Sequence, residues 1–262
     1  MSFQSYISLK LGFTDIDDKF ERIIKLLFDI QNAFDTNKER RALLKKIKGY
    51  THVNYTRLKG LWDLASQYSE NKGRGSFVET GVWRGGCAGI LSHISKKYGY
   101  KNKLFFFDSF EGLPQPVTED GLDAKKFANE NNNGQLKSIK KIVADDTYIK
   151  NLLFEKLDID KKKVNIIKGW FQKTLPKYKQ IIGPIGIMRL DGDWYESTKV
   201  CLENLYDLVL PGGYIIIDDY YYWDGCKKAT DEFIKLRNLN VEIIPQDLSG
   251  AYFIKPNRTN RS

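Results

Sequence analysis

The chain reads Met188-Arg189-Leu190-Asp191-Gly192-Asp193 and, further on, Ile215-Ile216-Ile217-Asp218-Asp219, so two apolar runs both end in carboxylates. We interpret both runs as strands of an α/β sheet. The carboxyl ends of neighbouring strands in such a sheet face one crevice, which is where ligands bind. Three or four aspartates that converge there need a cation to be tolerated. The pattern therefore predicts a divalent-metal site at the edge of a sheet.

Helix capping is a simpler explanation for one of these residues. Asp193 and Glu196 have the D-x-x-E spacing of a capping box, so Asp193 either belongs to the metal site or only caps a helix. Capping does not explain Asp191, Asp218 and Asp219 together.

Length and composition indicate a globular protein. The 262 residues fit one large domain or a core domain with an appendage, and 42% of them are hydrophobic. No apolar run approaches the roughly 18 residues of a membrane span, and residues 1–6 lack the features of a secretory signal. Three scattered cysteines indicate neither a disulfide framework nor a zinc site. We therefore expect a cytoplasmic protein that does not enter a membrane.

The net charge of +9 indicates an anionic partner, such as nucleic acid, a phosphorylated small molecule or a membrane surface. The lysines are spread along the chain in pairs and triplets, which is typical of a solvated face and disfavours specific nucleic-acid binding. A substrate that carries a nucleotide diphosphate would be attracted by the same positive charge.

Residues 1–72 have the periodicity of helices. Thr14 and Asp17 have the spacing of an N-terminal cap. Apolar residues then recur at helical intervals in two sets, which are Phe20, Ile23, Ile24, Leu27 and Phe34, and later Leu58, Leu61, Trp62 and Leu64. We expect this N-terminal helical region to form a dimer contact or one wall of a substrate pocket, in a homodimer or a higher homo-oligomer.

Residues 73–262 alternate short apolar runs with helical stretches, the rhythm of a mainly parallel sheet. We expect seven strands, near residues 76–82, 103–108, 164–168, 185–191, 213–218, 241–246 and 251–255. The loop between the last two runs is too short for a parallel crossover, so the last strand should be antiparallel. Residues 114–137 are polar and turn-rich, and they form either a mobile lid or a surface insertion.

Three strand ends have features of a nucleotide site. The first strand is followed by Gly81-Val82-Trp83-Arg84-Gly85-Gly86, whose spacing is neither the dinucleotide fingerprint nor a P-loop. Asp108 ends the second strand, where a carboxylate can accept ribose hydroxyls, although it could also cap the next segment. Gly169 ends the third strand, and Trp170 and Phe171 after it can cover a purine or belong to the core. Together these turns predict an adenosine-containing cofactor.

In order, these motifs resemble the macrocin O-methyltransferase family, whose members are S-adenosylmethionine-dependent sugar methyltransferases. The resemblance runs from about Arg57 to Phe253. The motifs that carry it are Val78-Glu79-Thr80-Gly81-Val82-Trp83-Arg84-Gly85-Gly86, Asp108-Ser109-Phe110-Glu111-Gly112-Leu113-Pro114, Gly169-Trp170-Phe171, Leu190-Asp191-Gly192-Asp193-Trp194-Tyr195-Glu196-Ser197-Thr198 and Pro211-Gly212-Gly213-Tyr214-Ile215-Ile216-Ile217-Asp218-Asp219-Tyr220.

The resemblance implies a class I methyltransferase sheet with S-adenosylmethionine in its crevice and a magnesium ion held by Asp191, Asp218 and Asp219. The cofactor contacts that it implies are Glu79 and Gly81 at the methionine part, Asp108 at the ribose, and Ser109, Trp170 and Phe171 around the adenine. The turn residues Thr80, Trp83, Gly85 and Gly169 complete the expected cofactor-binding set.

The expected activity is a magnesium-dependent O-methylation of a sugar hydroxyl. The acceptor would be a nucleotide-linked sugar for a surface polysaccharide or a glycosylated natural product. In this reaction a bound Mg²⁺ lowers the pKa of the hydroxyl and fixes it against the methyl group. The runner-up function is a nucleic-acid methyltransferase, but the chain lacks the amide-clamping N-P-P-Y motif and a Pro-Cys pair. A non-catalytic binding protein is a third possibility, which the retained carboxylates disfavour.

The general base is not evident from the sequence. Some relatives have a histidine in the lid region, but residues 114–137 contain none, and the chain has only His52 and His93. A packed or solvent-facing role is the simpler expectation for His93, whereas His52 could reach the pocket if the N-terminal region folds over it. We expect Asp191 or Asp193 to act as the base.

Overall fold

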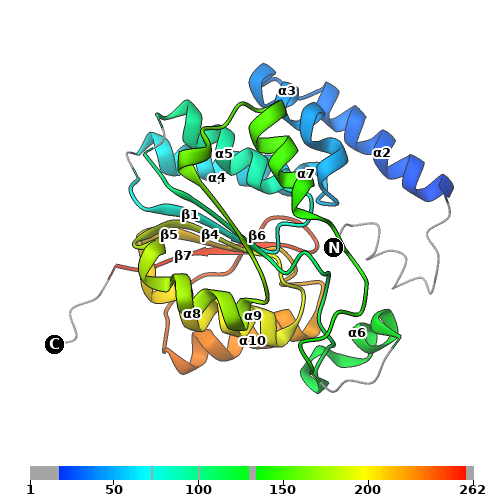
Figure 1. Cartoon of the computed structure of the whole chain (residues 1–262), viewed down its shortest axis with the longest axis vertical. Helices are drawn as coiled ribbons and strands as arrows, with labels where there is room; N and C mark the ends of the chain where they lie inside the picture. The colour runs from blue at the N-terminus through cyan, green and yellow to red at the C-terminus, as the bar shows by residue number, and fades with distance from the viewer. Residues whose placement is uncertain (1–17, 72, 100, 130–133, 258–262) are drawn as a thin grey trace.

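The structure is a computed structural model, and it describes residues 18–71, 73–99, 101–129 and 134–257. Within these residues, seven strands form one sheet in the order β3-β2-β1-β4-β5-β7-β6 (Figure 1). The strands are β1 (Ser76–Thr80), β2 (Leu104–Asp108), β3 (Val164–Lys168), β4 (Ile185–Leu190), β5 (Val209–Ile217), β6 (Ile244–Pro245) and β7 (Ala251–Ile254). The pairs among β1 to β5 are parallel, whereas β7 runs antiparallel to β5 and β6. The predicted seven-stranded, mostly parallel sheet with an antiparallel last strand is confirmed.

Two strands differ in length from the prediction. β5 begins at Val209, earlier than expected, and its pairing with β4 shifts register between Ile185 and Ile187. β6 keeps only Ile244 and Pro245 of the predicted run 241–246. Proline has no N–H to donate to a ladder, and it is found at sheet edges for that reason.

Helices cover both faces of the sheet (Figure 1). The helical elements are α2 (Asp18–Ala33), α3 (Lys38–Ile47), η1 (Lys48–Tyr50), α4 (Tyr55–Glu70), α5 (Gly86–Lys97), η2 (Thr118–Asp120), α6 (Gly121–Ala128), α7 (Asp146–Lys150), η3 (Asn151–Lys156), η4 (Lys161–Lys163), α8 (Phe171–Ile182), α9 (Tyr195–Leu205), η5 (Tyr206–Leu208) and α10 (Asp224–Leu236). Along β2, Phe106 packs with the cluster of α4 and α5, whereas Phe105 and Phe107 pack with that of α8, α9 and α10. Strands buried on both faces explain the continuous apolar runs of the sequence.

The N-terminal helical region packs on the α4 and α5 side of the sheet. The side chain of Asn54 caps α4 by accepting a hydrogen bond from the Arg57 N–H at 3.0 Å. Leu58, Leu61 and Trp62 are buried on this helix, so the helix predicted around them is confirmed. None of the described helices combines the length and the apolar character that a membrane span requires.

The first predicted apolar stripe runs along helix α2 and ends at Phe34 just after it, and the described side chains of that stripe do not face the core. Ile23 is 51% exposed, Leu27 48% and Phe34 83%, whereas Phe28 is buried. The remaining residues of that prediction lie outside the described positions, namely Thr14, Asp17 and the side chains of Phe20 and Ile24. The homo-oligomer stays a prediction, and these exposed side chains are where a dimer contact would be sought.

The predicted lid segment holds η2 and α6, which stand apart from the sheet in Figure 1. Asp120 anchors it, because Oδ1 accepts a hydrogen bond from the Tyr195 N–H at 2.6 Å and Oδ2 accepts one from the Val117 N–H at 2.7 Å. The Trp194 indole N–H also donates to the carbonyl of Pro114 at 2.8 Å. The segment is thus helical and attached to the start of α9, and its mobility stays a prediction.

Candidate active site

A cavity of about 330 Å³ lies at the carboxyl ends of β1, β2 and β4, within the range of small-molecule sites. The predicted site residues that line it are Glu79, Gly81, Trp83, Asp108, Ser109, Trp170, Phe171, Asp191 and Asp193. Residues 50–53 of the N-terminal region and Phe127 of the lid segment line it too. The cavity therefore gathers the three predicted nucleotide turns and the end of β4 in one place.

Asp108 is held by the turn that follows β1. Its Oδ2 accepts hydrogen bonds from the N–H groups of Val82 at 2.7 Å and Trp83 at 2.8 Å, and its Oδ1 accepts one from Phe110 at 2.7 Å. Burial raises the pKa of Asp108, and these three bonds oppose that rise. A carboxylate offers about four lone-pair positions, so Oδ1 can accept one more hydrogen bond from a ligand.

Gly81 brings the ends of β1 and β4 into contact. It has a φ of 88°, and a Cβ there would lie 1.7 Å from the main-chain oxygen of Asp191. Since no side chain fits at that distance, Gly81 is required for the close approach of the two strand ends.

Three residues of the predicted cofactor set lie behind the cavity wall. The Thr80 hydroxyl accepts a hydrogen bond from the Cys201 thiol at 3.4 Å in the core. Gly85 caps α5 with a φ of 97°, and the Gly169 N–H donates to the carbonyl of Asp108 at 2.8 Å. These residues shape the turns, whereas their neighbours line the cavity.

Arg189 is a buried cation that holds three carboxylates together. Its Nη1 lies 2.7 Å from Oε1 of Glu79 and 2.8 Å from Oδ2 of Asp191, and its Nη2 lies 2.5 Å from Oδ1 of Asp218. These groups come from β1, from the end of β4 and from the end of β5. An arginine inside a continuous apolar strand was the sequence signal for this role, because a buried charge requires partners.

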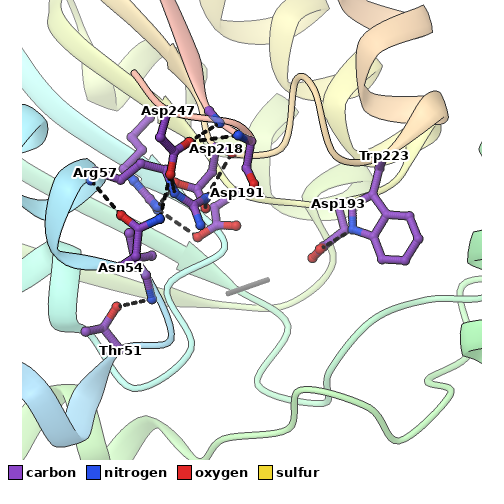
Figure 2. Close-up of polar contacts among 12 residues, drawn as sticks. Thr51, Asn54, Arg57, Asp191, Asp193, Asp218, Trp223 and Asp247 are labelled. Carbon is purple, nitrogen blue, oxygen red and sulfur yellow. Dashed lines mark hydrogen bonds and ion pairs between the residues drawn. The ribbon is translucent and has the colours of Figure 1, made fainter. Parts of the chain in front are cut away.

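Arg57 of α4 is the second buried cation of the site. Its Nη1 donates to Oδ2 of Asp218 at 2.5 Å and to the carbonyl of the same residue at 3.0 Å. Its Nε pairs with Asp247 at 3.2 Å, and the Asn54 amide donates to the same Asp247 oxygen at 2.5 Å. Figure 2 shows Arg57 between Asp247 and Asp218, beside Asp191. The N-terminal region therefore contributes to the carboxylate cluster as well as to the cavity wall.

Asp191, Asp193 and Asp219 each offer a carboxylate oxygen, and these oxygens lie within 4.8 Å of one another. Asp193 has a φ of 58°, and its Oδ1 accepts a hydrogen bond from the Trp223 indole N–H at 2.9 Å (Figure 2). It lies just before α9, whose N-cap position is occupied by Trp194. The geometry thus groups Asp193 with the other carboxylates.

Carboxyl groups outnumber guanidinium groups in this cluster. The carboxylates are those of Glu79, Asp191, Asp193, Asp218 and Asp219, and the guanidinium groups that face them are those of Arg57 and Arg189. Burial raises the pKa of Glu79 to about 8, and burial with the nearby Asp193 and Asp218 raises the pKa of Asp219 well above its ordinary value. Bound cations would relieve this excess. The oxygen atoms of these aspartates are the kind of ligand that Mg²⁺ prefers. Oε2 of Glu79 is buried and has no hydrogen-bond partner among the described residues, so it could accept a hydrogen bond from a cationic amine.

The two histidines lie in different places. His52 lines the cavity and stacks on Trp83, with 3.9 Å between ring centroids. His93 stacks on Trp62 and contacts Glu39 on the outer side of α5, so it is a packed surface residue.

Among the aromatic residues after β5, Tyr220 and Trp223 are buried and Tyr221 is 42% exposed.

Known proteins resemble the chain over most of its length. A model of the Macrocin-O-methyltransferase (TylF) family matches residues 19–255. The chain is 34% identical over 206 residues to demethyldecarbamoylnovobiocin O-methyltransferase of Streptomyces niveus, covering 78% of this chain and 75% of that protein. It is 28% identical over 206 residues to mycinamicin III 3''-O-methyltransferase of Micromonospora griseorubida, covering 78% of each.

Solved structures show the same fold. The O-methyltransferase NovP has a TM-score of 0.67 at 32% identity, over 79% of this chain and 83% of that one. The calicheamicin methyltransferase CalS11 has a TM-score of 0.65 at 18% identity, over 93% of this chain and 95% of that one, which is a likeness of fold. Because the family model spans nearly the whole chain, the protein belongs to the macrocin O-methyltransferase family of S-adenosylmethionine-dependent O-methyltransferases.

Proposed function

We propose that this enzyme methylates a hydroxyl group of a sugar and that a magnesium ion assists the transfer. One observation carries the proposal. The cavity is lined by Glu79, Asp191 and Asp193 of the carboxylate cluster as well as by Asp108, so a cofactor and a metal-bound acceptor can meet there.

The cofactor side of the cavity has the donors and acceptors that S-adenosylmethionine needs. Oε2 of Glu79 is a buried acceptor for the ammonium group, and Oδ1 of Asp108 can accept one ribose hydroxyl. The rings of Trp170 and Phe171 line the wall, where they can contact the adenine. When bound, S-adenosylmethionine would supply a methyl group on a positively charged sulfur.

We assign Asp191, Asp218 and Asp219 to the magnesium ion. Asp191 and Asp219 belong both to the sequence pattern and to the group with closely spaced oxygens. Asp218 accepts hydrogen bonds from two arginines, and its oxygens retain lone pairs for a metal. When bound, the ion makes a sugar hydroxyl more acidic and fixes its position.

Asp193 is the better candidate for the base. Its Oδ1 accepts a hydrogen bond from a neutral indole, whereas Oδ2 of Asp191 is engaged by the Arg189 cation. Asp193 also lines the cavity, so its carboxylate can accept the proton that the sugar hydroxyl loses as the new C–O bond forms.

We propose a nucleotide-linked sugar or a glycosylated natural product as the acceptor. The names of two relatives describe O-methylation of demethyldecarbamoylnovobiocin and of mycinamicin III. The net charge of +9 supports an anionic acceptor, such as a sugar joined to a nucleoside diphosphate.

The test is S-adenosylhomocysteine formation with a panel of nucleotide-sugars, glycosides and free sugars, followed by mass spectrometry of the product. We expect a product with one added methyl group on the sugar. Methylation of nucleic acid, with no turnover of any sugar in the panel, would contradict the proposal.

A further inference from the structure

A second cavity of about 970 Å³ adjoins the first. The two cavities share Thr51, His52, Val53 and Trp83 as lining residues, so the stacked pair of His52 and Trp83 stands at their boundary. The other walls of the second cavity come from α2, from the end of α3 and from the loop that holds Asp247. A ligand with its reacting part in the first cavity can therefore extend into the second.

Arg84 is prepared to bind an anion in this second cavity. Its guanidinium carbon lies 4.4 Å from the ring centroid of Trp83 and 4.7 Å from that of Tyr148 on α7. Its Nε is buried without a hydrogen-bond partner, and within the described residues no carboxylate pairs with this side chain. Stacking fixes the plane of a guanidinium group and leaves its edge available for two parallel hydrogen bonds.

The cavity as a whole is positively charged. Among the described residues that line it, the cationic side chains are those of Lys25, Lys45, Lys48 and Arg84, and the one carboxylate is that of Asp247. Asp247 is already neutralised by Arg57. Lys48 pairs with Asp29, which does not line the cavity. The excess of positive charge therefore faces the space in which a ligand would lie.

We propose that this second cavity binds the diphosphate of a nucleotide-linked sugar acceptor, with Arg84 as its main contact and Lys45 as a supporting charge. Phosphate oxygens match the planar donor edge of a stacked arginine. The rings of Phe28 and Tyr55 line the same cavity and suit the flat face of a nucleobase. This subsite rests on the proposed function, because it supplies the anchor that would place the sugar beside Asp193.

Direct binding tests the subsite without turnover. UDP, dTDP, GDP and inorganic pyrophosphate are titrated into the full-length enzyme by calorimetry, with EDTA present so that no metal at the aspartates can hold a phosphate. We expect at least one diphosphate to bind, and to bind more weakly as salt increases. Arg84→Gln should weaken that binding at least tenfold, and Lys45→Gln, at an exposed position, about threefold.

Arg74→Gln is the matched control, because Arg74 is exposed just before β1 whereas Arg84 lies just after it. It should bind the diphosphate as the wild type does. Equal binding of pyrophosphate and the nucleotides would assign the affinity to the diphosphate, and stronger nucleotide binding would add a contact with the nucleoside. Failure of all four probes to bind, or an unchanged affinity in both Arg84→Gln and Lys45→Gln, would overturn the subsite.

Steady-state kinetics distinguish an error in the diphosphate subsite from an error in the proposed function. With a nucleotide-sugar that serves as acceptor, Arg84→Gln should raise KM at least tenfold and leave kcat within about twofold, because the contact lies away from the reacting atoms. If sugars are methylated but diphosphates do not bind, the subsite alone is wrong. If diphosphates bind but no sugar is methylated, the proposed function is wrong and the binding site remains.

Discussion

Nη1 of Arg57, on α4, lies 2.5 Å from Oδ2 of Asp218, at the end of β5. The two residues are 161 positions apart in the chain, and both side chains are almost fully buried. Since Asp218 also receives a hydrogen bond from Arg189, its orientation is fixed from two sides. The N-terminal helical region is therefore part of the machinery that orients the carboxylate cluster.

Arg57→Gln should reduce the free energy of unfolding by about 3 to 5 kcal/mol, because it leaves Asp218 and Asp247 short of a buried cationic partner. Lys59→Gln is the control on the same helix. It breaks an exposed pair with Asp63, in which both side chains are more than 40% exposed, and should cost about 0.5 kcal/mol or less. Urea denaturation of both variants measures the difference. Equal losses would show that the Arg57 pair contributes no more than a surface pair.

Trp223→Phe should reduce kcat/KM about 10- to 100-fold, because it removes the indole N–H that donates to the Asp193 carboxylate. A hydrogen bond to a charged group is worth about 1.5 to 3 kcal/mol. The affinity for S-adenosylhomocysteine should stay unchanged, since Trp223 does not line the cavity. Tyr221→Phe, in the same aromatic run and 42% exposed, is the control. Initial rates and calorimetry measure both effects. A wild-type rate in Trp223→Phe would remove the indole from any role in orienting Asp193.

The pH dependence of stability should reveal Glu79. Burial raises its pKa to about 8 in the folded protein from an ordinary 4.5. Between these values the unfolded chain has lost the proton that the folded protein keeps, so this residue lowers the stability of the cofactor-free protein as pH rises from about 5 to 8. The full effect is on the order of 3 to 5 kcal/mol.

Glu79→Gln removes this titration and keeps a side-chain oxygen that can accept from Arg189. Free energies of unfolding at pH 5, 6.5 and 8 should therefore fall less steeply in the variant than in the wild type. If the free energy of unfolding changed with pH in the same way in both proteins, Glu79 would be ionised in the folded state throughout this range.

The residues at the strand ends were predictable from the sequence, because their positions follow from local pattern. Asp108 and Asp191 each end a mostly apolar run, the pair of Asp218 and Asp219 ends another, and parallel strands bring such ends to one edge. The lengths of β5 and β6 were less predictable, because pairing with neighbouring strands decides them.

The partners of the carboxylates depend on tertiary contacts and were not predicted. Arg57 reaches Asp218 only because α4 packs beside the end of β5, and no sequence pattern encodes that distance. The hydrogen bond from the Trp223 indole N–H to Asp193 is likewise visible only in the structure. Arg84 was part of a recognised turn, yet its side chain faces a second cavity formed with α2.

We propose that the aspartates at the ends of β4 and β5 hold a magnesium ion that the methyl transfer requires. This requirement is tested by S-adenosylhomocysteine formation in metal-free enzyme, titrated with Mg²⁺ at a saturating acceptor concentration. We predict a rate near background in EDTA, full recovery with Mg²⁺, and at least a 100-fold loss in Asp219→Asn that added Mg²⁺ does not restore. An undiminished rate after exhaustive chelation would contradict a magnesium requirement.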